Sequence, residues 1–301
     1  MKRLVLPIAS LLSASGLFGV QGAYAGATYS TDFENFALGS NTTTAPLVGA
    51  VDGWRGNGTS GTVGGTVDAE IVELSSGNQV FRISNGIGTS GNYDFTHPAT
   101  PTIDAAGESS LTGDTIDTFN FSFDFMSAFD GEQDGLQIDV TPFEGGTASR
   151  QGIVRIQDGG TDGFRVGWWE VNSGFNFLTL GTGLDRNVWH NLSVSMIFND
   201  GPSNDVVTLT LNGASTTSTS WEQYYSTAGT PQPALAPVDS VIFRVPTACS
   251  SLGTCNNVAD NGVYFDNFTQ SSSSSAVPVP PTLTLIGLGL AGLGYSLRKK
   301  S

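Results

Sequence analysis

The body of the chain contains no lysine. All three lysines and two of the nine arginines lie within the first three or the last four residues, whereas all 27 acidic residues lie between Asp32 and Asp266. The body therefore contains seven basic and 27 acidic residues, which gives it a net charge of about −20. Because a surface of this sign repels nucleic acid and anionic lipid headgroups, nucleic acid is excluded as a partner.

The N-terminus has the three parts of a secretory signal peptide. Lys2 and Arg3 precede an apolar stretch at 4–20, and Ala23-Tyr24-Ala25 offers a cleavage site between small residues. We therefore predict a signal peptide at 1–25, a β-domain at 26–270, a serine-rich flexible linker at 271–276 and a separate tail at 277–301.

Cysteine and histidine are scarce, with two of each. His97 and His190 lie far apart in the sequence, and so few ligands make a zinc site unfavourable. Cys249 and Cys255 lie six positions apart, and in an exported protein such a pair predicts a disulfide. Because the closed loop is so short, this disulfide should constrain a local loop of the chain and contribute little to the stability of the whole domain.

No long stretch of the body has the apolar spacing of a helix, and alternation of apolar and polar residues recurs instead. The strongest strand is predicted at 118–126, where four phenylalanines face one way and polar residues face the other. Burying each phenylalanine contributes about 1.5–3 kcal/mol, and the natural partner is a second sheet. Further strands are predicted at 29–36, 68–74, 79–83, 136–140, 152–156, 163–171, 192–198, 207–211, 241–245 and 264–268. Residues 214–220 show no clear strand, and 221–237 are predicted to form a long loop.

Several short motifs resemble those of a known fold group. The run Val188-Trp189-His190-Asn191 and the later Asn212-Gly213 turn resemble a hairpin of laminin-G-like domains, which belong to the concanavalin-A-like lectin/glucanase group. The opening Asp32-Phe33-Glu34 and the closing run 264–268 are similar to the paired terminal strands of such domains. The fold class implied is an all-β, two-sheet antiparallel jelly-roll sandwich, with an N-terminal signal helix and a C-terminal apolar helix outside the fold.

The C-terminal tail resembles the PEP-CTERM sorting signal of Gram-negative bacteria. Val277, Pro278 and Pro280 begin a proline motif, an apolar run follows at 282–297, and Arg298, Lys299 and Lys300 end it as a cytoplasmic flank would. The resemblance implies a transient anchor in the inner membrane and cleavage by an exosortase. Val279 stands where the family motif has glutamate, which leaves open the sorting enzyme that reads the tail. A plain membrane anchor is the alternative, although the run is shorter than the roughly 20 residues of a full span.

Aromatic residues are the candidate sugar-binding groups, because their faces stack on pyranose rings. Trp169 shares a strand face with Arg165, on the side opposite to the predicted core face, and these two residues form the leading candidate site. Trp54, Trp221 and Tyr224 are further candidates in loop-like stretches. For each aromatic residue the alternative is simple packing, under a loop or in the core.

Two other sites follow from the fold resemblance. Jelly-roll domains often hold a structural calcium ion where the first and last strands meet, which points to Glu34 and Asp266. A glucanase needs two carboxyl groups across the sugar. The nearest approach to the family's catalytic run is 132–137, where Gln137 replaces the second glutamate and the surrounding residues favour turns. No catalytic residues are therefore predicted.

These observations lead to the expectation of an exported, non-catalytic protein at the cell surface or in the extracellular matrix. It would be associated with exopolysaccharide or biofilm, with carbohydrate binding as a candidate activity. The alternatives are a glucanase-type glycoside hydrolase and a purely structural surface protein. The expected partners are the export machinery, an exosortase-type enzyme, the inner membrane before processing and an extracellular polysaccharide.

Overall fold

The computed structural model describes the body of the chain with gaps. The described residues are 25–40, 54, 68–86, 100–107, 116–144, 150–171, 175–201, 203–222, 224, 237–247, 249, 252, 255–256, 258 and 260–274. The predicted signal peptide at 1–25, apart from Ala25, and the tail at 277–301 lie outside these ranges, as do Arg55 and His97. No helix among the described residues is long and apolar enough to cross a membrane.

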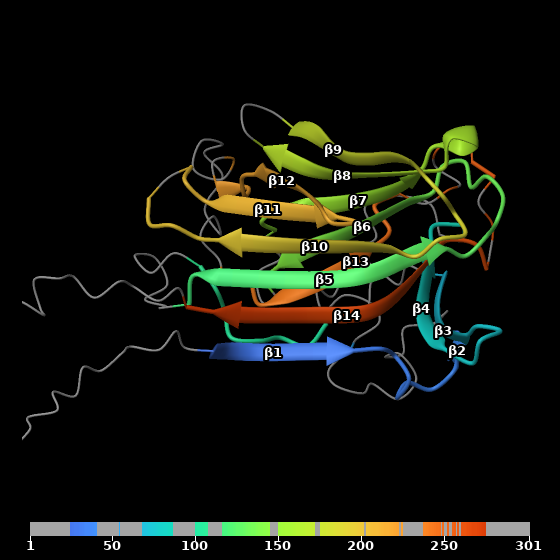
Figure 1. Ribbon diagram of the computed structural model, residues 1–301, viewed down its shortest axis with the longest axis horizontal. Coiled ribbons are helices and arrows are strands. Elements are labelled where there is room, and N and C mark those ends of the chain that lie inside the picture. Colours follow the sequence, from blue (N-terminus) through green and yellow to red (C-terminus); the bar gives the residue numbers. More distant parts are fainter. Residues whose placement is uncertain are drawn as a thin grey trace, which may run out of the picture. The chain divides into compact units, whose positions relative to one another are not determined.

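Two antiparallel sheets form a sandwich, as the alternation predicts (Figure 1). The larger sheet has the order β12-β11-β10-β5-β14-β4-β3-β2, with β1 also paired to β14. Its strands are β1 (Ala25–Thr31), β2 (Gly39–Ser40), β3 (Asp68–Glu73), β4 (Gln79–Ser84), β5 (Thr118–Ser127), β10 (His190–Ile197), β11 (Val206–Leu211), β12 (Ala214–Ser218) and β14 (Val263–Ser273).

The smaller sheet has the order β13-β6-β7-β8-β9. Its strands are β6 (Gln137–Phe143), β7 (Ile153–Asp158), β8 (Phe164–Val171), β9 (Phe175–Leu184) and β13 (Ser240–Arg244), and a short 3₁₀ helix, η1 (Gly160–Asp162), links β7 to β8. All-β sandwich architecture of the jelly-roll type is therefore confirmed.

The core lies between the two sheets and is rich in aromatic side chains. The four phenylalanines of β5 are at most 2% exposed, which confirms the predicted apolar face of this strand. Phe243 of β13 packs against Phe123 of β5 and Phe265 of β14, with ring centroids 6.0 and 4.8 Å apart. These contacts join the two layers, because β13 belongs to the smaller sheet and the other two strands to the larger.

The first and last strands pair, as the fold resemblance implies. Tyr29 of β1 lies opposite Gln270 of β14. The pairing extends from Thr31, which lies opposite Phe268, back to Ala25, which lies opposite Ser273 at the end of β14. The first strand starts earlier than predicted and ends at Thr31, while Phe33 and Phe36 follow in a turn and are buried in the core. The predicted linker also needs correction, because Ser271 to Ser273 belong to β14. They stay in the sheet because β1 and β5 pair with them on both sides.

Apart from the two-residue β2, two strands were not predicted. β12 consists of small polar residues, and it forms because β11 offers it a hydrogen-bonding edge across the Asn212-Gly213 turn. β9 covers the edge of β8 although several glycines and threonines weaken its apolar alternation. In both strands tertiary pairing decides the structure, and the local pattern is a poor guide.

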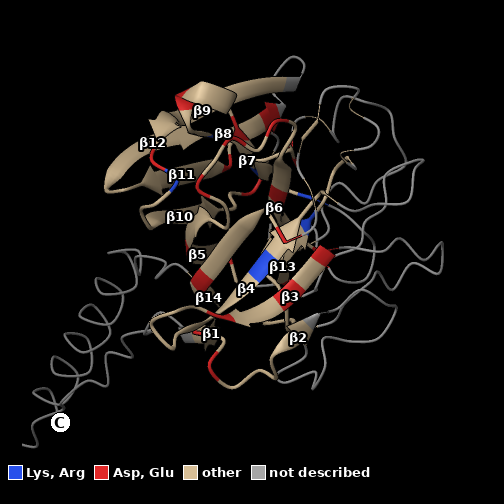
Figure 2. Cartoon of the chain, turned by 90° about the vertical axis from the view of Figure 1, so that its right-hand side faces the viewer, with Lys and Arg blue, Asp and Glu red and all other residues tan. Residues whose placement is uncertain are grey.

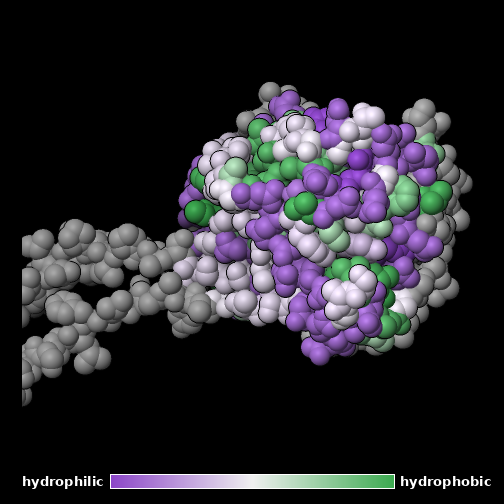
Figure 3. All heavy atoms as spheres, turned by 45° about the vertical axis from the view of Figure 1, so that its right-hand side comes forward, coloured by the Kyte–Doolittle hydropathy of each residue, from purple (hydrophilic) through white to green (hydrophobic). Residues whose placement is uncertain are grey.

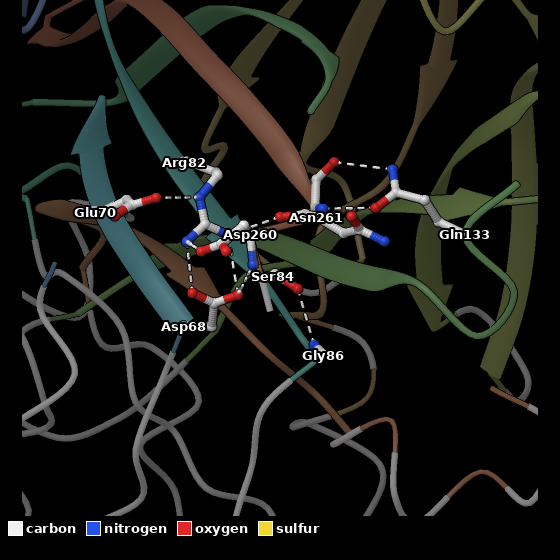
Figure 4. A network of polar contacts seen from close by, with 9 residues as sticks. Asp68, Glu70, Arg82, Ser84, Gly86, Gln133, Asp260 and Asn261 are labelled. Carbon is white, nitrogen blue, oxygen red and sulfur yellow. Dashed lines mark hydrogen bonds and ion pairs between the residues drawn. The ribbon is translucent and has the colours of Figure 1, made fainter. Parts of the chain in front are cut away.

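A buried polar network holds the β3–β4 hairpin to the turn before β14 (Figure 4). The Arg82 guanidinium, with a side chain 2% exposed, donates to both Asp68 oxygens, to a Glu70 oxygen at 2.8 Å and to the Asn261 carbonyl at 2.7 Å. Burial alone would lower the pKa of Arg82, but the hydrogen bonds and charges of Asp68 and Glu70 raise it. The guanidinium therefore remains charged and ties three segments together.

Candidate functional site

The outward side of the five-stranded sheet carries a cluster of arginine and aromatic residues. Strand alternation sends Ile138, Val154 and Val166 into the core, so their neighbours along the chain point to the opposite side. We call this side the arginine face, and it consists of Gln137, Asp139, Thr141, Ile153, Arg155, Gln157, Arg165, Gly167, Trp169, Phe177, Thr179, Ile242 and Arg244. The registers of the four strand pairs bring these residues side by side.

One row of this face centres on a buried carboxylate. Asp139 of β6 lies opposite Arg155 of β7 and opposite Arg244 of β13. The Asp139 carboxylate, which is 0% exposed, accepts hydrogen bonds from Nε and Nη2 of Arg155 at 2.7 and 3.0 Å. Its Oδ2 also lies 3.6 Å from Nη1 of Arg244. The Asp139 carboxylate thus contacts two guanidinium groups and fixes both of them in place.

Aromatic rings continue this row toward the edge of the sheet. The Arg155 guanidinium lies over the Trp169 ring, 5.0 Å from its centroid, and the Arg165 guanidinium lies 4.5 Å from the centroid of Phe177. Trp169 and Phe177 themselves meet edge to face at 5.9 Å. Cations over aromatic faces attract the ring electrons, so each ring holds its arginine in place. Arg165 is the exposed member, and Arg155, Trp169 and Phe177 are partly exposed.

Gly167 makes room for this stack. A Cβ atom at this position would lie 2.3 Å from Cζ of Phe177 and 2.7 Å from the carbonyl oxygen of Leu178. Any side chain here would therefore push the Phe177 ring away from the sheet, and with it the surface on which Arg165 rests. The glycine is needed for its lack of a side chain and not for an unusual backbone angle.

Four of the five aromatic or basic candidates from the sequence gather at the arginine face. Trp169 and Arg165 share the face as predicted, and the side chains of Trp221 and Tyr224 pack beside Trp169. The indole Nε1 of Trp221 donates to the Trp169 carbonyl at 2.7 Å. Trp221 is only 6% exposed, so it supports Trp169 from beside and offers little surface of its own.

Trp54 has to be removed from the candidate ligand-binding residues. Its side chain is 0% exposed and contacts Phe33, Phe36, Phe81 and Phe243, while its Nε1 donates to the Tyr29 hydroxyl at 2.8 Å. The sequence around it is rich in glycine and resembles a loop. The indole is nevertheless one of the two largest fully buried side chains, together with Trp168, because the surrounding aromatic residues leave space for it.

The two predicted calcium ligands lie beside the same turn. A Glu34 carboxylate oxygen accepts from the Gln79 amide at 2.8 Å, and Asp266 accepts from the Asn78 side chain at 2.9 Å. Burial raises the pKa of Asp266, and the charges of Asp124 and Asp32 add to this shift. Among the described residues no group of three or more carboxylate, histidine or cysteine side chains could hold a metal ion. Calcium binding therefore stays a prediction.

The run 132–137 lies in a turn and at the start of β6. Glu132 and Asp134 are exposed, whereas Gln133 is fully buried and bonds Ser127 and both backbone groups of Gly262. Gln133 thus belongs to the clamp on the turn before β14 (Figure 4). The structure gives this run a structural role, and it does not set two carboxylates across a sugar.

The two cysteines form a disulfide, with Cα atoms 5.5 Å apart. Cys255 lies against Gly135, where a Cβ atom would be 2.5 Å from its Sγ. The small disulfide loop is thus packed on the turn that leads into β6. It holds a local part of the chain, as its length predicts.

A model of one protein family matches the end of the chain, and it is described as the PEP-CTERM protein-sorting motif at residues 276–300. The chain ends in a PEP-CTERM sorting motif. This finding confirms the resemblance of the tail and implies export and processing by an exosortase-type enzyme. The match does not test the replacement of glutamate by Val279. Among curated proteins, no sequence matches this chain.

Solved structures with a similar fold include two polysaccharide lyases and a carbohydrate esterase. Alginate lyase A1-II′, of polysaccharide lyase family 7, is 14% identical, with a TM-score of 0.42, over 68% of this chain and 84% of its own. The endo-β-1,4-glucuronan lyase of Trichoderma reesei is 11% identical, with a TM-score of 0.40, over 77% and 95%. A carbohydrate esterase of bacteriophage phi24B is 16% identical, with a TM-score of 0.41, over 79% and 100%.

The expectation of a non-catalytic matrix protein is wrong in the light of these structures. It rested on the fold group together with an incomplete set of hydrolase residues. At such identities the likeness shows the fold alone. What this chain does with a polysaccharide must therefore come from its own residues.

Sequence reasoning missed Asp139, Arg155, Arg244 and Phe177. The signal was present for the first three, since each one stands between apolar residues that point to the core. Charged residues at the outward positions of three separate strands become a site only when the strand order is known. β13 pairs with β6 although almost a hundred residues separate them, and no local pattern indicates that pairing.

Proposed function

We propose that this protein is an exported enzyme that cleaves an acidic polysaccharide, and that the arginine face binds the substrate. The main observation behind this proposal is the position of the basic residues. Three of the seven body arginines, Arg155, Arg165 and Arg244, point to one side of one sheet in a strongly acidic chain. Arg165 is exposed and Arg155 is partly exposed, whereas Arg244 is buried, at 4% exposure. Figure 2 shows how sparse the basic residues are among the acidic ones (Figure 2).

The chemistry of these groups suits a uronic acid polymer. Guanidinium groups bind carboxylates through paired hydrogen bonds, and aromatic rings offer an apolar surface to pyranose rings. Arg165 and the partly exposed Trp169 and Phe177 supply both functions within a few ångströms of each other. The half-exposed amides of Gln137 and Gln157 lie opposite each other on the same face and can orient sugar hydroxyls.

We propose β-elimination as the reaction, because the negative charge that develops in it is what this face would stabilise. In elimination a base takes the proton from the carbon beside the uronate carboxylate, the bond to the neighbouring glycosidic oxygen breaks, a carbon–carbon double bond forms, and the leaving oxygen is protonated. Negative charge grows on the carboxylate during this reaction, and fixed guanidinium groups stabilise it. Arg155 and Arg165 are held for that role by Asp139, Trp169 and Phe177.

Hydrolysis by the glucanase mechanism needs two carboxyl groups facing the sugar. Among the described outward-facing residues of the five strands, Asp139 is the only carboxylate, and it is fully buried between two arginines. The described part of this face therefore does not supply that pair of groups.

The test is an assay of the full-length protein on polyuronates and on neutral β-glucan. We expect polyuronate to give products with a new ultraviolet absorbance, because elimination creates a double bond conjugated to the carboxylate. Arg165→Gln should lower kcat/KM at least tenfold, equivalent to about 1.4 kcal/mol, and Arg165→Lys should restore part of it.

Two results would overturn the proposal. One is release of reducing ends from neutral β-glucan without ultraviolet absorbance, which would indicate a hydrolase. The other is unchanged turnover of polyuronate by Arg165→Gln, which would place the substrate elsewhere. The exposed change Asp162→Asn, in η1 at the end of the same sheet, serves as a control that leaves the arginine face intact.

A further inference from the structure

The outward side of the larger sheet carries a regular array of hydroxyl groups. One row crosses six strands and is made of residues that are successive partners in the strand pairs: Ser30, Thr269, Ser122, Ser193, Thr210 and Ser215. The next row, two residues further along each strand, consists of Thr28, Ser271, Asn120, Ser195, Thr208 and Thr217. We call these two rows the hydroxyl face, and all twelve residues are exposed or partly exposed.

The array lies on strands that run side by side. Figure 1 shows β11, β10, β5, β14 and β1 as neighbours, in the order of the registers (Figure 1). In Figure 3 the lower left of the described surface is mostly pale, which is the colour of weakly polar residues (Figure 3). No groove or pocket is needed to define this surface, because the sheet itself presents it.

The hydroxyl face carries no charge, although the body of the chain has a net charge of about −20. Eleven of its twelve residues have a hydroxyl and the other is an asparagine, so every position can both donate and accept a hydrogen bond. Two cross-strand pairs already show this, since Ser122 and Thr269 lie 2.7 Å apart and Thr210 and Ser215 lie 2.8 Å apart between hydroxyl oxygens. A matching partner must also donate and accept and must be neutral, which describes a polymer of neutral sugars.

The spacing favours an extended chain over a small molecule. Neighbouring strands lie about 4.8 Å apart, so one row of six positions extends over about 24 Å. This step is close to the length of one pyranose unit in an extended polysaccharide. Sheets also twist by roughly 20° from strand to strand, and a flexible chain can follow such a surface whereas a flat crystal plane cannot.

We propose that the hydroxyl face binds a neutral polysaccharide, with the sugar chain lying across strands β1, β14, β5, β10, β11 and β12. This surface is separate from the arginine face, which lies on the other sheet and points away from the core on the opposite side of the sandwich. The protein would thus hold a neutral matrix with one side and act on an acidic polymer with the other.

The experiment is retention of the full-length protein on insoluble neutral glycans whose chains are not packed in crystals, with amorphous cellulose, amorphous chitin and gelled β-1,3-glucan as the probes. We expect the wild type to partition into at least one of them, and Ser193→Asp to reduce the partition coefficient at least tenfold. Ser193 lies between Ser122 and Thr210, so the new charge enters the middle of a neutral row without an ion-pair partner.

Thr182→Asp provides the matched control, because it adds the same charge at an exposed position of β9 on the other sheet. This variant and Arg165→Gln should both be retained like the wild type. The proposal fails if the wild type is retained on none of the three glycans, or if Ser193→Asp is retained equally well. If Arg165→Gln abolishes retention, the arginine face binds the neutral glycan, and this result would also overturn the proposal. Far-ultraviolet circular dichroism of each variant separates loss of binding from loss of folding.

Discussion

Arginine serves two different purposes in this protein, and burial decides between them. Arg82 is enclosed by two carboxylates and a carbonyl, so its hydrogen bonds are used within the fold. Arg165 instead rests on Phe177 and donates to the Thr179 hydroxyl at 3.1 Å, with its side chain exposed to solvent. Neither of these neighbours carries a negative charge. The guanidinium charge of Arg165 is therefore not neutralised by these neighbours and can meet an anionic ligand.

Asp266 gives a prediction about pH. Its folded-state pKa is raised above the ordinary value of 3.8, first by burial and further by Asp124 and Asp32. The folded state therefore binds the proton more tightly than the unfolded state does. The stabilisation that protonated Asp266 gives to the folded state is fully present below about pH 3.8, and it is lost as the pH rises through the folded-state pKa of Asp266. Wild type should accordingly lose stability relative to Asp266→Asn between about pH 4 and about pH 7.

The measurement is the free energy of unfolding in urea for both proteins at the two pH values. Asparagine also removes one hydrogen-bond acceptor for the Asn267 amide and the Asn78 side chain, and this loss contributes to the difference between the two proteins at each pH. The informative quantity is thus the change with pH and not the difference at a single pH. An equal stability difference at both values would show that burial does not disfavour the charge.

At the level of elements, alternation predicted the core well and the site poorly. The outward and inward positions of β5, β8 and β10 follow directly from the sequence, because each strand repeats its apolar residues in steps of two. Trp169 and Arg165 could be placed on one face for the same reason. Trp54 could not be placed, since an isolated indole in a glycine-rich stretch carries no periodic signal, and its burial depends on aromatic residues from four other segments.

Long-range pairing explains the remaining failures. Asp139 and Arg244 come together only because β13 lies beside β6, and the hydroxyl rows exist only because six strands align in register. A single strand with serine or threonine at every second position merely looks solvent-exposed. The sequence contains the residues of both faces, while the topology decides which of them are neighbours.

The clamp around Arg82 should be among the strongest tertiary links of the β3–β4 hairpin. Arg82→Met leaves Asp68 buried, at 4% exposure, without its cation, and we expect a loss of about 3–5 kcal/mol in the free energy of unfolding. The double variant Arg82→Met/Asp68→Leu should recover part of that loss, because no unpaired charge then remains. Urea unfolding of the two variants measures both effects. If Arg82→Met is as stable as the wild type, the ion pair makes no net contribution to the free energy of unfolding.

At the scale of the whole molecule, charge separates two surfaces. Acidic residues dominate the body, yet one sheet has an outward face with three arginines and the other has an outward face with two uncharged rows. The sorting motif indicates the export route, since it implies export and then processing of the tail by an exosortase-type enzyme. We propose that a protein on this route meets extracellular polymers, and that its two faces bind acidic and neutral ones respectively.

The most direct test of the central claim is the dissociation constant of a uronate oligosaccharide for the full-length protein. Calorimetry on wild type, Arg165→Gln and Arg165→Lys should show binding that weakens at least tenfold in the glutamine variant, recovers in part with lysine, and weakens further with added salt because exposed charges are screened. The neutral oligosaccharide of the same length should not compete. Equal affinity of wild type and Arg165→Gln for the uronate, or equal binding of the neutral sugar at the same site, would contradict the account.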